Sequence, residues 1–243
     1  MRVYPAAGGF VVRWNPVPFA IFLSRGRRDG VPEAVFDVTG RASFFDEYRV
    51  WPFFEEVWYW ISDEKGTVLE KARAVPQDRL VLLAVERIEE TAKVQGVPVA
   101  LLFAKVGGKT CPRCYDETLK KPTDPFCPTC LGTGFEGGYV GPVKTYAVKQ
   151  SSFVRGKKNV DPIVQTFDSA TFFLSSKFPL SPKDLVVDLQ SGGIYRVVAV
   201  EERLEKGIPV SQTCQATLLE RQNPAYKAFK IEGTPEGVKV ARI

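Results

Sequence analysis

Two short cysteine motifs constrain the fold of this chain more than any other feature. They are Cys111-Pro-Arg-Cys114 and Cys127-Pro-Thr-Cys130, separated by residues 115–126. Each CxxC turn can direct two thiolates at one ion, so two turns supply the four sulfurs of a tetrahedral zinc site. Four protein ligands leave no open coordination position, which makes the metal structural rather than catalytic. The sequence therefore predicts a structural Zn²⁺ bound by Cys111, Cys114, Cys127 and Cys130.

The surroundings of the cysteines favour a metal site over a redox or phosphate-binding role. A thioredoxin-like dithiol would need a βαβ pattern around each CxxC motif, which the sequence lacks. An iron centre of the rubredoxin type uses the same four thiolates, so zinc and iron both stay open. The glycine-rich residues 131–139 follow a knuckle and open no helix, which favours tight turns around the metal over a phosphate-binding loop. Cys214 lies in an alternating strand, which predicts a buried thiol outside the metal site.

The absence of histidine restricts the chemistry that the chain can perform. None of the 243 residues is histidine, which excludes Ser-His and Cys-His catalysis and histidine metal ligands. The adjacent carboxylate pairs point to opposite faces of a strand or diverge on a helix, so they predict no paired acid–base site. These pairs are Glu55-Glu56, Glu89-Glu90 and Glu201-Glu202. We expect no enzyme activity and no catalytic residues.

Charge and hydropathy argue against a nucleic-acid or membrane partner as the main ligand. The net charge of +5 is spread along the chain. The short basic runs Arg25-Gly26-Arg27-Arg28 and Lys157-Lys158 predict solvated loops. The sequence has no apolar stretch near the roughly 20 residues that span a bilayer, and its N-terminus lacks the apolar region of a signal peptide. We expect a soluble protein, made in the cytoplasm, with no membrane contact.

The pattern of apolar residues predicts a mainly β fold that begins with a sandwich over residues 1–77. The predicted strands, aromatic and β-branched, span 10–14, 19–23, 34–38 and 57–61. The segment Glu56–Gly66 resembles a late strand and hairpin of an immunoglobulin or fibronectin type III module. Trp58 and Trp60 share one face of their strand, and with Trp51 they favour a packed core over a sugar-binding platform.

A connecting helix is predicted over residues 78–97. Its apolar stripe consists of Val81, Val85, Ile88 and Ala92. Asp78 can cap the start of this helix and Gly96 can end it. The predicted zinc ribbon follows over residues 98–142.

The C-terminal part predicts a small antiparallel β-barrel over residues 143–222. The five predicted strands span 143–148, 171–174, 185–189, 194–200 and 210–219. Gln190-Ser-Gly-Gly193 is predicted to form a hairpin turn, because glycine tolerates positive φ. Residues 223–243 are predicted to form an extended C-terminal arm.

The helix and cysteine segment, residues 79–142, resembles a group of tailed-bacteriophage virion proteins. In that group a helix leads into a short β segment, a CPxC knuckle followed by an aromatic residue and Asp, a second knuckle, and GTGFxGGY. Here the matching residues include Tyr115-Asp116, Gly132-Thr-Gly-Phe135 and Gly137-Gly-Tyr139. The residues from Asp184 to Val197 also resemble the small barrel of phage head-closure and head–tail joining proteins.

This resemblance implies a structural protein of the virion, a neck or head–tail connector component. It further implies a ring of copies of the chain, a portal-side adaptor and a tail terminator or tube protein as partners, and non-specific contact with DNA in the lumen. The alternative is a zinc-ribbon nucleic-acid-binding or chaperone-like module. Cys127–Gly134 is similar to the CxxCxGxG zinc repeat of J-domain co-chaperones, although the first knuckle lacks the glycines and the chain lacks an HPD motif.

Overall fold

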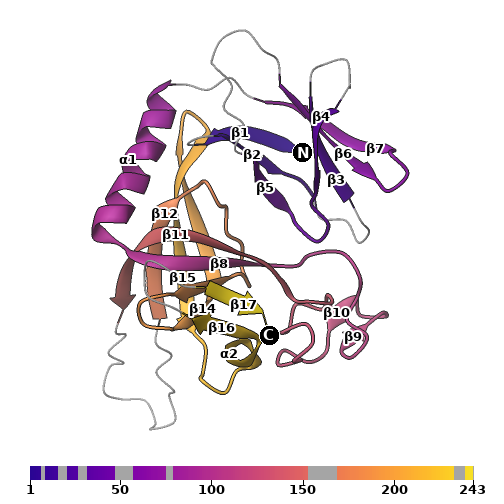
Figure 1. Cartoon of the computed structure of the whole chain (residues 1–243), viewed down its shortest axis with the longest axis vertical. Coiled ribbons are helices and arrows are strands. Elements are labelled where there is room, and N and C mark those ends of the chain that lie inside the picture. Colours follow the sequence, from indigo (N-terminus) through magenta and orange to yellow (C-terminus); the bar gives the residue numbers. More distant parts are fainter. Residues whose placement is uncertain are drawn as a thin grey trace.

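A computed structural model of the protein describes residues 1–6, 9–15, 21–26, 32–46, 57–74, 79–152, 169–232 and 239–242. These residues form a β-sandwich, a long helix, a closed β-barrel and a cysteine-containing loop (Figure 1). The predicted mainly β architecture with a small antiparallel barrel is confirmed. Within the described ranges, no helix has the length and apolar character needed to cross a membrane.

Two antiparallel sheets make up the N-terminal sandwich. Its strands are β1 (Arg2–Ala6), β2 (Gly9–Arg13), β3 (Ile21–Gly26), β4 (Pro32–Asp37), β5 (Ser43–Asp46), β6 (Trp58–Asp63) and β7 (Val68–Arg73). One sheet has the order β1-β2-β5 and the other has the order β4-β3-β6-β7. Side chains alternate between the two faces of each strand, so Val12, Leu23 and Tyr59 point into one shared core, where all three are fully buried.

Trp58 and Trp60 lie on the face of β6 that points away from this shared core. They alternate with Tyr59 and Ile61, which belong to the core. The ammonium nitrogen of Lys71 lies 5.0 Å from the ring centre of Trp58 and 5.6 Å from that of Trp60. The two tryptophans therefore share one face, as predicted. The third tryptophan of the prediction, Trp51, lies outside the described residues.

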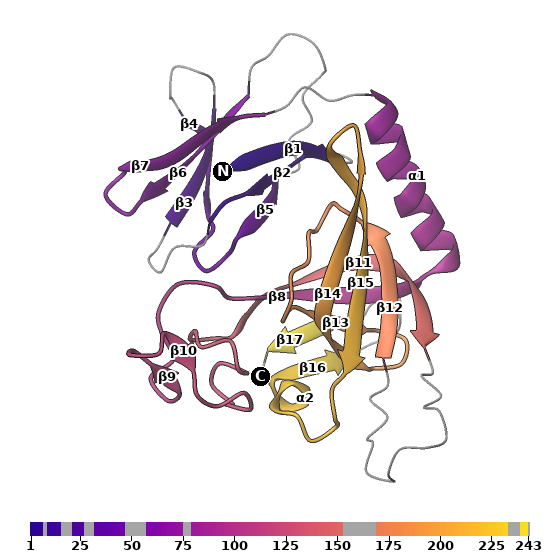
Figure 2. The same cartoon turned by 180° about the vertical axis from the view of Figure 1, so that it is seen from behind.

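Helix α1 (Arg79–Gln95) runs along the side of the barrel (Figures 1 and 2). Val81 and Val85 pack against Ile208 and Val210, which lie on a long hairpin of the barrel. The predicted helix and its apolar stripe are confirmed. The helix ends at Gly96, whose N–H donates to a carbonyl of the last turn at 2.9 Å. The predicted cap, residue 78, lies outside the described ranges.

The barrel is closed by six antiparallel strands. These are β8 (Val97–Ala104), β11 (Tyr139–Ser152), β12 (Ser169–Ser175), β13 (Leu185–Asp188), β14 (Ile194–Glu205) and β15 (Ile208–Leu218). Their order around the barrel is β11-β12-β15-β14-β13-β8. Leu101, Phe172 and Val197 fill the interior, as expected of a barrel of this size. The predicted hairpin turn at residues 190–193 joins β13 to β14.

Strand β8 is the main difference between this barrel and the sequence prediction. The prediction gave the barrel five strands and assigned residues 98–142 to the zinc ribbon, but β8 pairs with β11 and β13 and closes the barrel. Val99 and Leu101 face the barrel interior, whereas Ala100 and Leu102 face a second apolar cluster outside it. Closure removes the unpaired edges that a five-stranded sheet would leave.

The C-terminal segment folds back onto the barrel rather than extending as the predicted arm. It forms α2 (Pro224–Ala228), β16 (Phe229–Glu232) and β17 (Lys239–Arg242). The Asn223 side chain accepts a hydrogen bond from the Ala225 N–H at 3.0 Å and so caps α2. Ala225 and Phe229 cover the outward-facing Leu102. Without this cover, the outer apolar side chains of β8 and β13 would be exposed to water.

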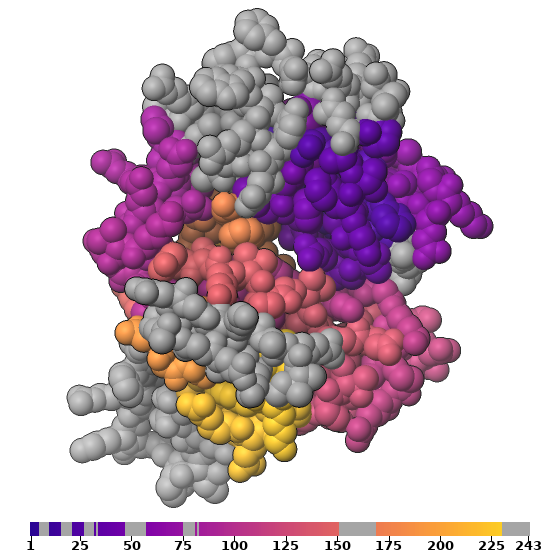
Figure 3. All heavy atoms as spheres, viewed as in Figure 1, coloured from indigo at the N-terminus to yellow at the C-terminus, as the bar shows by residue number. Residues whose placement is uncertain are grey.

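The cysteine loop, residues 105–138, connects β8 to β11. It contains the two-residue strands β9 (Tyr115–Asp116) and β10 (Lys121–Pro122). At its start, the Val106 N–H donates to the Gly40 carbonyl of the sandwich at 3.2 Å. Figure 3 shows the indigo sandwich seated directly against the pink surface of this loop. The loop therefore contacts both the barrel and the sandwich.

Further contacts hold the sandwich against the barrel. Arg13 on β2 forms an ion pair with Glu202 on β14. The rings of Phe45 on β5 and Phe178 meet edge to face, with centres 5.6 Å apart. These contacts, with those of α1, place the sandwich over one side of the barrel (Figure 2).

Candidate metal centre

The four cysteines of the two knuckles meet at one point inside the cysteine loop. All four Sγ atoms lie within 4.8 Å of one another. The Sγ atoms of Cys111 and Cys127 are 3.8 Å apart, and those of Cys114 and Cys130 are 3.3 Å apart. Four thiolates around one zinc, at about 2.3 Å each, would have sulfur–sulfur distances of about 3.8 Å. The predicted ligands are thus brought together at distances compatible with one metal ion.

Backbone hydrogen bonds position each knuckle. The first is closed by the Tyr115 N–H, which donates to the Cys111 carbonyl at 3.1 Å, and the second by the Leu131 N–H, which donates to the Cys127 carbonyl at 2.7 Å. The Cys111 N–H donates to the Gly134 carbonyl at 2.8 Å and joins the two knuckles. These bonds fix the two turns relative to each other, so the sulfurs converge.

Two glycines allow the chain to turn closely around the centre. Gly132 has φ 82° and Gly138 has φ 68°. A Cβ atom at Gly132 would lie 2.5 Å from the Pro125 carbonyl oxygen, and one at Gly138 would lie 2.6 Å from the Cys130 carbonyl oxygen. Both positions need glycine for its conformation and for space. This geometry agrees with the prediction that the glycines serve tight turns.

Replacing Gly138 with alanine is expected to weaken metal binding, because the Cys130 carbonyl must move to admit the new methyl group. The matched control is Gly192→Ala, since Gly192 has φ 70° but no atom within 4 Å of its Cβ position. The control should lose about 1 kcal/mol of stability through backbone conformation alone, and Gly138→Ala at least about 2 kcal/mol more. Thermal unfolding and chelator competition measure both effects; equal losses in the two variants would contradict the expectation.

Burial and local hydrogen bonds affect the acidity of the thiols. Burial raises the pKa of Cys114 and of Cys130. Burial also acts on Cys127, but the backbone N–H groups of Cys130 and Thr129 outweigh it and lower the pKa of Cys127 to about 7. A metal ion must displace the remaining thiol protons to bind, so binding releases protons. The donor set consists of sulfur alone, and its role would be to hold the loop together rather than to activate water.

The fifth cysteine is separate from this centre. Cys214 is fully buried in the barrel interior, on β15. Burial raises the pKa of its thiol to about 12. The prediction of a buried thiol is confirmed.

The sequence analysis missed three charged residues that the barrel holds largely out of water. Lys149 forms an ion pair with Asp188 at 2.8 Å, and Asp184 is buried near the end of β8. The sequence does indicate that Lys149 is largely buried, because it lies two residues after Ala147 and thus on the face of β11 that points into the barrel. Asp184 and Asp188 flank a buried strand, where carboxylates need partners that sequence alone does not identify.

Asp184 is expected to titrate near neutral pH. Its two carboxylate oxygens accept hydrogen bonds from the Ala104 and Ser181 N–H groups, each at 2.7 Å. Burial dominates and raises the pKa of Asp184 to about 7. The folded state therefore binds more protons than the unfolded state between about pH 4 and that value, and stability should fall as pH rises through this window. Carboxyl ¹³C NMR measures this; a midpoint near pH 4 would contradict it.

The four-sulfur centre is defined by the geometry of this chain alone. Its ligand spacing, its burial and its turns are compatible with a metal site in the loop between two neighbouring barrel strands. Four thiolates at these distances suit zinc and iron alike. Comparison with known proteins finds no family model that matches the chain and no curated protein with significant similarity to it.

Proposed function

We propose that this chain is a structural virion protein of a tailed bacteriophage, a neck component that joins the portal side of the head to the tail. In this proposal copies of the chain form a ring, bind a portal-side adaptor and a tail terminator or tube protein, and surround the DNA without reading its sequence. The protein is made in the host cytoplasm and works in the virion. It acts by binding and not as an enzyme.

The observation that carries the proposal is that the cysteine loop contacts both the barrel and the sandwich. The loop leaves and re-enters the barrel through neighbouring strands, and Leu131 packs into the apolar cluster on the outside of the barrel. Its start is hydrogen-bonded to Gly40 of the sandwich. A closed metal centre at this junction would hold two modules in one fixed arrangement, which suits a component of a ring. The motif resemblance over residues 79–142 supplies the phage context.

We also propose that the metal is zinc and that the sandwich is a fibronectin type III-like module. Four thiolates and a closed tetrahedral site are the usual structural zinc donor set. In the sandwich the fourth strand pairs with the third, whereas a constant-type immunoglobulin domain pairs its fourth strand with the fifth. Strand orders β1-β2-β5 and β4-β3-β6-β7 support the fibronectin-like variant.

Electron microscopy of lysates from a phage lacking this gene tests the proposal, together with mass spectrometry of purified wild-type particles. We expect filled heads beside complete, unattached tails, and peptides of this chain in the wild-type virion. Complementation with the wild-type gene should restore joined particles, and complementation with a Cys127→Ser gene should not. Normal particles that lack these peptides would reject the structural role and favour the nucleic-acid-binding or chaperone-like alternative.

A further inference from the structure

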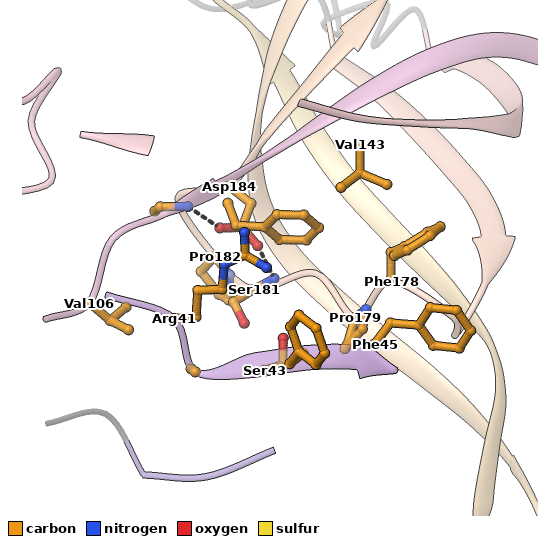
Figure 4. A pocket seen from close by; sticks show the side chains of 14 residues that line it. Arg41, Ser43, Phe45, Val106, Val143, Phe178, Pro179, Ser181, Pro182 and Asp184 are labelled. Atoms are coloured by element: carbon orange, nitrogen blue, oxygen red, sulfur yellow. Dashed lines mark hydrogen bonds between the residues drawn. The ribbon is translucent and has the colours of Figure 1, made fainter. Parts of the chain in front are cut away.

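A cavity of about 150 Å³ lies between the sandwich and the barrel. Figure 4 shows its lining: Arg41 and Phe45 reach in from the sandwich, and Val143, Phe178 and Asp184 from the barrel side. A cavity of this volume with apolar walls is large enough for a benzene ring. It is too small for a nucleotide or a folded peptide segment, since typical drug-sized pockets begin near 300 Å³.

The aromatic walls suit a flat apolar group. Phe45 and Phe178 meet edge to face with ring centres 5.6 Å apart, and Phe103 also lines the cavity. Aromatic rings prefer such tilted arrangements, and a third ring placed against this pair from within the cavity would gain contact area and could adopt the same favourable edge-to-face geometry. Each module supplies part of this wall, so the cavity exists only in the assembled chain.

Arg41 gives the cavity a positive charge, which Asp37 offsets in part. Its side chain is partly buried, and its guanidinium carbon lies 5.8 Å from the ring centre of Phe44. Among the described residues, its guanidinium has no hydrogen-bond acceptor and no ion-pair partner within 4.0 Å. Burial lowers the pKa of Arg41, although Asp37 opposes this effect. A partly buried guanidinium whose donors have no partner among the described residues favours a carboxylate or a similar planar anion.

Asp184, the acidic residue that lines the cavity, does not fill this role. Each of its two oxygens accepts a hydrogen bond, one from the Ala104 N–H and one from the Ser181 N–H. In Figure 4 Arg41 extends toward Asp184 and Ser181, but no hydrogen bond joins the arginine to the carboxylate. Burial raises the pKa of Asp184 to about 7, so a share of the carboxyl groups is neutral near that pH and repels an anion less.

We propose that this cavity binds a small carboxylic acid built on a single ring, with its carboxylate on Arg41 and its ring against Phe45, Phe103 and Phe178. The inference is independent of the proposed virion role. A carboxylate accepts two parallel hydrogen bonds from a guanidinium, which fixes the orientation of the ligand. The ring then occupies the apolar part of the space.

Fluorine NMR of the full-length, metal-loaded protein with 4-fluorobenzoate tests the inference. We expect binding to the wild-type chain at least about tenfold tighter than that of 4-fluorobenzyl alcohol, a neutral probe of similar shape, because a tenfold ratio corresponds to one charge-assisted contact. Arg41→Gln should weaken benzoate binding by about the same factor and leave the alcohol unchanged, and Arg41→Lys should restore part of it. Arg2→Gln, an exposed arginine of the same sandwich, is the control.

Three results would overturn the inference. The first is the absence of any broadening of the 4-fluorobenzoate signal when about 10 mM of this probe is mixed with the wild-type protein. This result needs no variant. The second is an equal loss of benzoate binding in Arg41→Gln and Arg2→Gln. The third is unchanged binding in Val143→Phe, a variant that fills the cavity, once thermal unfolding shows that this variant is folded. Loss of binding in Val143→Phe supports the site.

Discussion

Removal of the metal by a strong chelator is expected to unfold the cysteine loop and to destabilise the chain more than any single substitution outside it. The apolar cluster inside this loop consists of the four cysteines with Tyr115 packed against them, whereas Leu119 and Phe126 are exposed. With so little apolar burial, we expect the loop to depend on metal–sulfur bonds for its fold. Structural zinc contributes about 10–16 kcal/mol in zinc-finger peptides at pH 7.

Hydrogen exchange would locate the effect of metal removal. Amides of residues 105–138 should lose protection first, because their turns are closed by bonds around the centre. This loss should include Val106 and Leu131, although they contact the sandwich and the barrel cluster. The barrel interior around Phe172 should keep its protection, since it has its own core. Loss of protection throughout the barrel would show instead that the metal supports the whole fold.

A pair of cysteine variants provides the control for this prediction. Cys127→Ser should purify without bound metal, because three thiolates and a hydroxyl bind far more weakly than four thiolates. Cys214→Ala removes a buried thiol outside the centre and should keep one metal ion per chain. Elemental analysis of the wild-type protein identifies that ion as zinc or iron. Full metal content in Cys127→Ser, or an apo protein as stable as the holo protein, would contradict the prediction.

The parts of the fold that the sequence predicted depend on local patterns. The CxxC spacing predicted the cluster of four sulfurs, since each knuckle fixes two ligands within four residues. Periods of 3.6 and 2 predicted a helix over 78–97, which the structure has at 79–95, and most strands, because burial on one face leaves this trace in the sequence. The hairpin turn at 190–193 was predicted by its paired glycines. These features need no knowledge of distant partners.

The parts that the sequence did not predict depend on contacts between distant residues. Strand β8 joins the barrel by pairing with strands that begin at Tyr139 and Leu185, and its continuous apolar run does not reveal those partners. The C-terminal segment, residues 223–243, was predicted to be an extended arm. Ala225 and Phe229 nevertheless cover the outside of the barrel. The cavity at Arg41 likewise requires two modules to meet.

The second large effect on stability is expected from the replacement of Lys149, whose ammonium group pairs with a buried carboxylate at the end of the barrel. The Lys149 ammonium lies 2.8 Å from an Asp188 oxygen and 2.8 Å from the Tyr195 hydroxyl. Asp188 is 2% exposed. Lys149→Met should therefore cost about 3–5 kcal/mol at pH 7, because it leaves a buried charge without its partner. Chemical denaturation at several pH values measures this cost.

The pH dependence of the Lys149→Met effect distinguishes a lost charge from lost packing. Although burial opposes it, the hydrogen bonds from Lys149 and Ser191 hold the pKa of Asp188 below its usual value. The wild-type ion pair thus contributes stability above the unfolded aspartate pKa of about 3.9, and this contribution is lost as pH falls through the folded pKa. The cost of Lys149→Met should shrink in acid, where Asp188 takes up a proton. The control is Lys144→Met, at an exposed position on the same strand. It should cost less than about 0.5 kcal/mol of stability at both neutral and acidic pH. A cost of Lys149→Met that does not change with pH would assign the effect to packing alone.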